Sequence, residues 1–234
     1  MPLRVYLIIL AVIVVLGGVV YGLDAIPWFR VTDVAVTGNT LVSASDVRQA
    51  LTALTAKKPV LALLGGDHVF LWLRSGEVAL NIPAVRSASV QSHPFERRID
   101  VVVRERTFAG IQCTETECAA FDEEGIVYAR APEAVGQLFL VVRGEEELSS
   151  KEVARFSEVR NTLAARGVAV SEMRMRAAEL NEWEVVLTDG KTLYFDRSFI
   201  PDDFGAIMEA LIAREDFAKM HSVDFRVPNK IYFR

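Results

Sequence analysis

The sequence predicts an α+β protein with a single transmembrane helix at its N-terminus, followed by a small mixed unit and by a larger, strand-rich unit with two helices. Three observations predict this architecture. The first stretch of the chain is apolar and free of charge. The rest contains short segments in which apolar residues alternate as they do in strands, and between these lie segments with apolar residues at helical spacing.

The N-terminal apolar stretch has the length of a membrane span. No charged residue occurs from Val5 to Leu23, and at ~1.5 Å per residue these positions form a helix of roughly 28 Å, close to the ~30 Å hydrocarbon layer. A cleaved signal peptide is the alternative, but its apolar region is usually ~7 to 15 residues long and ends at a small-x-small site. The sequence Gly22-Leu23-Asp24-Ala25 provides no clean site of this kind. We therefore expect a transmembrane helix at residues 5–23.

The flanks of this stretch predict its orientation. Arg4 is the only charged side chain before it, whereas Asp24 and the interfacial aromatic Trp28 follow it. Because positive charge favours the inner side of a membrane, residues 1–4 are expected to be a cytoplasmic tail and residues 24–30 a juxtamembrane linker. Everything that follows is then extracytoplasmic.

The first exterior unit, residues 31–106, is predicted to have the order strand, helix, helix, strand, strand. Ser43 is placed to cap the first helix, with Asp46 three residues on, and Val42 and Val47 can form a hydrophobic staple. The predicted elements are a strand at Phe29–Val36, a helix from Ser43 to Leu54, a short helix around Gly76–Ile82, and strands at Val85–Ser92 and Arg98–Arg104; the apolar runs Val60–Leu64 and Val69–Leu73 have no assigned element.

The second exterior unit, residues 107–234, is predicted to be richer in strands. Ser149 and Glu152 predict a helix start through a capping box, and Gly167 predicts its end. A parity change of the apolar residues between Val170 and Met173 predicts a β-bulge. The predicted strands are Ala119–Phe121, Ile126–Tyr128, Leu138–Val142, Val168–Ala177, Trp183–Leu187, Thr192–Phe195, Ser222–Val227 and Ile231–Arg234, and the second helix runs from Asp202 to Ile212.

The two cysteines, Cys113 and Cys118, both fall in the part expected outside the cytoplasm, where disulfides persist. Their spacing suits a short hairpin closed by a bridge, and a loop this small gains only ~2 kcal/mol from the crosslink. Free thiols remain an alternative. A metal site is disfavoured because no histidine lies close enough in sequence to complete a ligand set.

Composition and motifs predict binding rather than catalysis. After Arg4, the chain has 25 basic and 31 acidic residues (26 basic residues in all, less Arg4), and these are interspersed, so no nucleic-acid footprint is expected. The sequence contains no nucleophile elbow, zinc-binding helix, phosphate loop or dinucleotide fingerprint. His68, His93 and His221 lie in three separate segments. We expect no enzyme activity, no cofactor and no small-molecule substrate.

Several segments carry a resemblance to a known family. The chain resembles the FtsQ/DivIB family of bacterial cell-division proteins, in which a POTRA domain follows the membrane span and a β domain completes the chain. The similar segments are Val34-Ala35-Val36-Thr37-Gly38-Asn39, Ile82-Pro83-Ala84-Val85, Val103-Arg104-Glu105-Arg106, Phe121-Asp122-Glu123-Glu124-Gly125-Ile126-Val127 and Val223-Asp224-Phe225-Arg226.

The resemblance implies a non-enzymatic scaffold of the division machinery in the cytoplasmic (inner) membrane, enriched at the septum. Its partners would be divisome proteins of the FtsB and FtsL type, bound when a partner segment adds a strand to the terminal edge of the β domain. Other septal membrane proteins would contact the POTRA domain or the transmembrane helix. The candidate surface for the added strand is Arg226, Val227, Ile231, Tyr232 and Phe233. Alternatively, Ile231 and Phe233 pack on the chain's own last helix.

Two other functions compete with this interpretation. The first is an envelope protein whose POTRA module acts in export or in outer-layer assembly. The second is an anchored hydrolase with scattered catalytic residues, which predicts that His93 or His221 meets a carboxylate in a deep cleft. A continuous exposed sheet edge at Ile231 to Phe233 would favour the scaffold instead.

Overall fold

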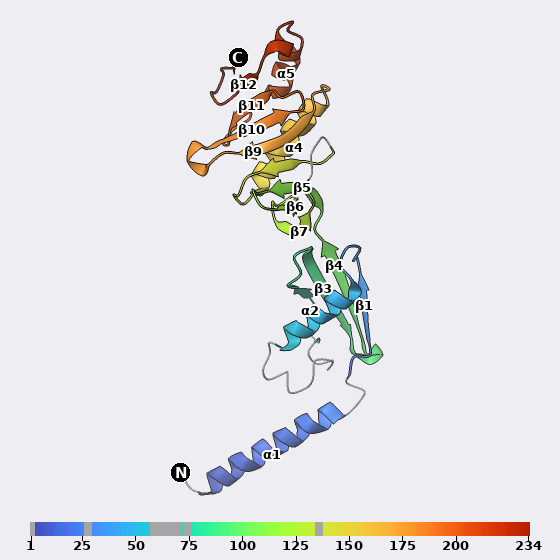
Figure 1. The fold of residues 1–234 in the computed structure, drawn as a ribbon. Helices are drawn as coiled ribbons and strands as arrows, with labels where there is room; N and C mark the ends of the chain where they lie inside the picture. The colour runs from blue at the N-terminus through green and yellow to red at the C-terminus, as the bar shows by residue number, and fades with distance from the viewer. Residues whose placement is uncertain (1–2, 26–29, 57–71, 73–75, 134–137) are drawn as a thin grey trace. The chain divides into compact units, whose positions relative to one another are not determined.

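A computed structural model describes residues 3–25, 30–56, 72, 76–133 and 138–234 (Figure 1). The chain divides into two compact units, Met1–Arg106 and Thr107–Arg234. The fold is α+β, because each unit combines helices with a sheet of its own.

The N-terminal helix α1 spans Leu3–Ala25, and its side chains from Tyr6 to Val19 are exposed. Among the described residues, however, no helix is long and apolar enough to cross a membrane. This finding contradicts the predicted transmembrane helix at 5–23, and the fold class is corrected to α+β without that span.

The first unit contains a four-stranded sheet in the order β1-β4-β3-β2. Its strands are β1 (Asp33–Thr37), β2 (Gly76–Val78), β3 (Val85–His93) and β4 (Arg98–Glu105). β1 is parallel to β4, and the other two pairs are antiparallel. Helix α2 (Ala44–Ala56) contributes Val47 and Leu51 to the buried cluster that also holds Ile99, Val101 and Val103 of β4. The predicted alternation of these β4 residues is confirmed.

The predicted helix around Gly76–Ile82 is wrong. Residues Gly76, Glu77 and Val78 form β2 and pair with Val90, Ser89 and Ala88 of β3. This pairing gives hydrogen-bond partners to the backbone groups of β3 that do not bond to β4. The stabilisation from the sheet outweighs the helix preference of the local sequence. The described part of this unit therefore has the order strand, helix, strand, strand, strand. The run Val60–Leu64, and Val69–Leu73 except for Trp72, lie outside the described residues.

The start of α2 is fixed by two side chains. Ser43 acts as predicted, because its Oγ accepts the N–H of Asp46 at 3.1 Å. The carboxylate of Glu105 accepts the N–H groups of Thr40 and Leu41, each at 2.9 Å, and that of Val42 at 2.8 Å. Burial raises the pKa of Glu105, but these bonds and one from the Thr40 hydroxyl outweigh it and lower the pKa to about 2.

The second unit contains a nine-stranded sheet in the order β13-β12-β11-β10-β9-β8-β5-β6-β7 (Figure 1). The strands are β5 (Phe108–Cys113), β6 (Cys118–Asp122), β7 (Val127–Ala131), β8 (Val141–Arg143), β9 (Val170–Met175), β10 (Glu182–Leu187), β11 (Thr192–Asp196), β12 (Ser222–Asp224) and β13 (Tyr232–Phe233). β7 and β13 are the two outermost strands.

Helices α4 (Ser150–Ala164) and α5 (Phe204–Ile212) build the core of this unit with one face of the sheet. The predicted capping box is confirmed, since Ser149 and Glu152 bond reciprocally at the start of α4. Aromatic rings fill the core near β12. Phe195 stacks on Trp183 at 4.5 Å and on Phe225 at 5.2 Å between ring centroids, and Phe204 meets Phe225 edge-on at 5.5 Å.

In this unit one strand was missed, and several predicted strands begin or end at other residues than expected. β5 was not predicted at all, and Leu138–Val142 contributes only its last two residues to β8. The predicted bulge is present on β9, because Val186 faces Glu172 whereas the next residue, Leu187, faces Val170. The two last strands are shorter than Ser222–Val227 and Ile231–Arg234, since a turn at Asn229, with φ of 61°, occupies the residues between them.

Candidate partner-binding edge

The outermost strand β13 leaves one row of backbone groups unpaired by the sheet. The N–H of Ser222 donates to the Arg234 carbonyl and the N–H of Arg234 to the Ser222 carbonyl, both at 3.1 Å. Hydrogen-bonded and non-hydrogen-bonded pairs alternate along an antiparallel ladder, and the next pair is Val223 with Phe233. The backbone N–H and C=O of Phe233 therefore point away from β12. They are oriented to pair with an incoming strand.

The side chains of β13 divide between the two faces of the sheet. Phe233 lies opposite Val223, which is fully buried in the core, so Phe233 is on the face that α4 and α5 cover. Tyr232 lies opposite Asp224 on the other face. The residues keep 53% (Tyr232) and 44% (Phe233) of their surface exposed. Large aromatic side chains of this exposure at a free strand are typical of binding surfaces.

Arg226 is held rigidly beside this edge by two carboxylates. Its Nε and Nη2 donate to the two oxygens of Asp224 at 2.9 and 2.5 Å, and its Nη1 donates to Glu182 at 2.6 Å. The guanidinium also lies over the ring of Tyr194, 5.3 Å from its centroid. The hydrogen bond from Arg226 lowers the pKa of Asp224 in spite of partial burial. The arrangement presents a fixed, partly exposed cation.

One row of paired residues crosses all nine strands on the Tyr232 face. In order, the row is Ala131, Cys118, Cys113, Arg143, Arg174, Glu184, Tyr194, Asp224 and Tyr232. Glu172 bridges the two neighbouring arginines, at 2.5 Å to Arg143 and 2.6 Å to Arg174. From Arg143 to Tyr232 the charged residues of this row are paired with one another or with neighbours, whereas the row's other end belongs to the small apolar cluster of Ile111, Cys113 and Val141. The opposite face is packed with apolar side chains.

The other predicted residues flank the edge. Ile231 is partly buried and packs against the core cluster, to which the last helix contributes Phe204, Met208 and Leu211. Val227 is 41% exposed and borders a hollow shared by the segments 199–207 and 227–231. A second hollow, lined by Arg226, Ile231, Tyr232 and Phe233 among others, follows β13 itself. The guanidinium of Arg214, which follows the last helix, lies 4.9 Å from the centre of the Phe233 ring.

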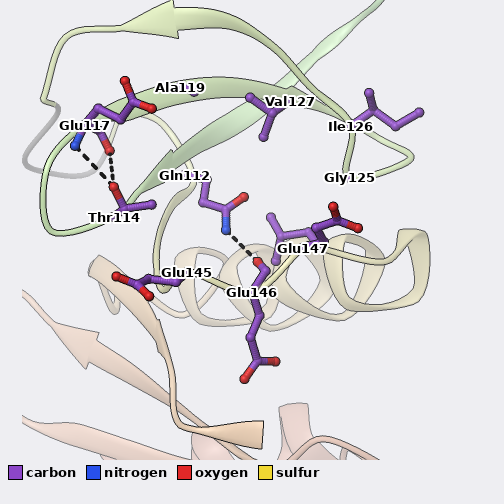
Figure 2. Close-up of a pocket in the computed structure, with 11 residues that line it drawn as sticks. Gln112, Thr114, Glu117, Ala119, Gly125, Ile126, Val127, Glu145, Glu146 and Glu147 are labelled. Atoms are coloured by element: carbon purple, nitrogen blue, oxygen red, sulfur yellow. Dashed lines mark hydrogen bonds between the residues drawn. The ribbon is translucent and has the colours of Figure 1, made fainter.

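The sulfurs of Cys113 and Cys118 are bonded to each other and close the β5–β6 hairpin near the opposite end of the sheet. A hollow lies beside this hairpin, lined by the residues drawn in Figure 2. Figure 2 shows Gln112 pointing from β5 to the loop 145–147, where its amide donates to the Glu146 carbonyl at 2.7 Å. The loop glutamates and Glu117 give the hollow an acidic lining.

The hydrolase alternative requires a histidine next to a carboxylate in a deep cleft. His93 does meet a carboxylate, with its Nε2 3.2 Å from the Asp100 oxygen, but both side chains are 32% exposed on the β3–β4 hairpin. Asp100 also accepts from Arg98 at 2.6 Å. His221 has no carboxylate within ion-pair distance among the described residues, and His68 lies outside them. Within the same described residues, no cluster of three or more His, Cys, Asp or Glu is arranged to hold a metal.

Comparison with known proteins gives no match to this chain, either among protein-family models or among curated sequences.

Sequence reasoning missed the residues that orient the edge. Glu182, Tyr194 and Asp224 hold Arg226, and Arg214 contacts Phe233. A sequence signal was available for Tyr194, because its position two residues from Thr192 and Asp196 places it on the polar face of an alternating strand. No local pattern indicates the contacts of Arg214 and Glu182, which come from segments distant in the sequence.

Proposed function

We propose that this chain is a protein-binding scaffold of the bacterial cell-division machinery, similar in role to the FtsQ/DivIB proteins. It binds partners of the FtsB and FtsL type, acts at the division septum and performs no catalysis of its own. The observation that carries the proposal is the outer edge of β13. There the backbone N–H and C=O of Phe233 point away from β12, and the side chains of Tyr232 and Phe233 are both exposed.

A partner segment in extended conformation adds to β13 as a tenth strand. Its backbone pairs with that of Phe233, and its alternating side chains meet Tyr232 on one face and Phe233 on the other. The guanidinium of Arg226 lies in the hollow beside Tyr232, where an N–H group that Asp224 and Glu182 do not use can donate to a polar group of the partner. Because Arg226 is already oriented by Asp224 and Glu182, binding costs little side-chain entropy there.

The disulfide supports a location outside the cytoplasm. Cys113 and Cys118 are bonded, and bonds of this kind persist in oxidising compartments but not in a reducing cytosol. This location is where the extracytoplasmic segments of division proteins meet.

The test is depletion of this protein in its own host, followed by microscopy of cell length and nucleoid spacing. The proposal predicts long filaments with regularly separated nucleoids, because chromosome replication continues while septa fail to form. Cells of normal length that leak or fail to export proteins would contradict the proposal. That outcome would favour the role in export or outer-layer assembly.

A further inference from the structure

The strand at the other end of the large sheet, β7, also has a free side. Thr114 donates its N–H to the Glu117 carbonyl at 2.9 Å, which makes this pair hydrogen-bonded in the β5–β6 ladder. Bonded and non-bonded pairs alternate along an antiparallel ladder, so the backbone N–H and C=O of Ala119 point to β5. Those of the next residue, Ala120, point to β7, where Ala120 is paired with Ala129. The neighbouring residue on β7, Arg130, therefore directs its own N–H and C=O away from the sheet. Among the described strands, β7 has β6 as its single neighbour.

Two hollows border this edge, one on each face of the sheet. The first, shown in Figure 2, lies between the β6–β7 turn and the loop before α4, with Ile126 and Val127 on one side and Glu145 and Glu147 on the other. The second is lined by both ends of the β5–β6 hairpin and by Arg130, Ala131 and Glu133, among others. An added strand places alternate side chains on opposite faces, so each hollow is positioned to take every second side chain.

The lining of these hollows specifies the charge of the occupant. Glu117 belongs to both hollows, and Glu145 and Glu147 belong to the first. In the second hollow Glu133 is paired with Arg143 at 3.2 Å, so the acidic preference comes from the first. Within the described residues, Glu145 and Glu147 have no ion-pair partner, and Glu117 is 3.9 Å from the exposed Arg130. Exposed apolar surface accompanies the charge, since Ile126 and Val127 are 42% and 48% exposed.

We propose that β7 is a second strand-accepting edge, and that its occupant is a basic, extended polypeptide segment in which lysine or arginine alternates with aliphatic residues. The backbone of the segment pairs with Arg130, and its cations meet Glu117, Glu145 and Glu147 while its aliphatic side chains cover Ile126 and Val127. This site is separate from β13 and does not depend on the proposed role in division. It allows the large sheet to hold two extended segments at once, one at each end.

The experiment uses the purified full chain and a fluorescein-labelled heptapeptide of alternating lysine and valine, with binding followed by fluorescence anisotropy at low salt. We expect saturable binding that weakens as salt is added, and no binding of the matched peptide of alternating glutamate and valine. The doubly substituted variant Glu145→Gln/Glu147→Gln should bind the basic peptide about fivefold more weakly. Glu158→Gln, an exposed change on α4, is the control and should bind as the unsubstituted chain does.

A proline substitution tests the strand pairing itself. Arg130→Pro removes an outward N–H that β6 does not use, so the sheet is preserved while the incoming strand loses a donor. We expect Arg130→Pro to bind the basic peptide at least about tenfold more weakly than Arg130→Ala, and Phe233→Pro to leave this binding unchanged. Equal binding by the two Arg130 variants, or equal binding of the acidic peptide, would overturn the proposal.

Amide hydrogen exchange shows directly which strand the peptide protects. It requires no substituted chain, so it decides the question if Arg130→Pro does not fold. Added basic peptide should slow exchange in residues 127–131 and leave residues 232–233 unaffected. Protection at β13 instead, or no protection at either strand at a saturating peptide concentration, contradicts a second edge at β7. Failure of this experiment leaves the β13 proposal untouched, because that proposal is tested by cell division.

Discussion

The two ends of the nine-stranded sheet are both free edges, but they are stabilised by different forces. The β13 end rests on stacked aromatic rings, and its charges are neutralised in pairs such as Arg226 with Asp224. The β7 end has a smaller apolar cluster around Ile111 and Val141 and a disulfide between β5 and β6. In the adjoining loop, Glu145 and Glu147 have no ion-pair partner among the described residues. The comparison indicates that one sheet can offer two edges with different partner preferences.

The largest effect on the free energy of unfolding is expected from the aromatic core next to β12 and β13. Phe225 is fully buried between Phe195 and Phe204, so Phe225→Ala should lower the free energy of unfolding by about 3–5 kcal/mol. Urea denaturation followed by tryptophan fluorescence measures this loss, since Trp183 belongs to the same stack. Phe95→Ala is the control, because Phe95 is exposed on a hairpin of the other unit and should change stability by less than about 0.5 kcal/mol. A loss below about 1 kcal/mol for Phe225→Ala would show that the rings do not support this end.

The disulfide should matter only at the β7 end. The double change Cys113→Ala/Cys118→Ala is expected to cost about 2 kcal/mol, because the bridge closes a short loop in the unfolded chain. Amide exchange should become faster in β5, β6 and β7 and stay the same in β12 and β13. Treatment of the unsubstituted chain with a reductant serves as the matched control. Faster exchange at β13 in the variant would mean that the two ends are coupled.

Acid should weaken the β13 end. The pKa of Asp224 is lowered in the folded chain by its hydrogen bond to Arg226. Its contribution to stability is therefore present above the unfolded value of ~3.9 and lost as the pH falls through the lower folded value. Asp224→Asn should cost about 1 kcal/mol at pH 7 and close to nothing once the pH is well below the lowered folded pKa. A difference between the two chains that does not depend on pH would exclude this ion pair as the cause.

Alkali should weaken the β7 end by a smaller amount. Burial, and then the charge of Asp122, raise the pKa of Tyr128 in β7 above its ordinary value. The neutral phenol is thus favoured in the fold, and its contribution is complete below the unfolded pKa of ~10 and lost as the pH rises through the folded value. Absorbance titration at pH 8 to 12 should show one tyrosine ionising late, and Tyr128→Phe should remove that late step. Retention of the step in Tyr128→Phe would assign it to another residue.

Local patterns predicted most elements of both units, and failures occurred where distant segments decide. Ser149 and Glu152 specify a helix start by themselves, and the alternation of Trp183, Val185 and Leu187 requires one buried face, so both were readable. β2 and β5 were missed because they form through pairing with β3 and with β6 and β8. The contradicted membrane span was inferred from the run 5–23 alone.

The candidate edge was only partly predictable. Tyr232 and Phe233 stand out as adjacent aromatic residues near the end of the sequence, but their role depends on β13 being outermost, which is a property of the whole sheet. The β7 edge gave no signal, because the acidic residues that border it lie in separate segments of the sequence. Only the fold brings Glu117 and Glu145 to the same hollow.

The most direct test of strand addition at β13 is the rescue of depleted cells by two variants at one position. Phe233→Ala removes the ring but keeps the outward N–H, whereas Phe233→Pro also removes that donor without breaking a bond to β12. With equal protein levels and equal melting temperatures, we expect Phe233→Ala to restore cell length largely and Phe233→Pro to leave the cells filamentous. Full rescue by Phe233→Pro would contradict the pairing of a partner strand with β13.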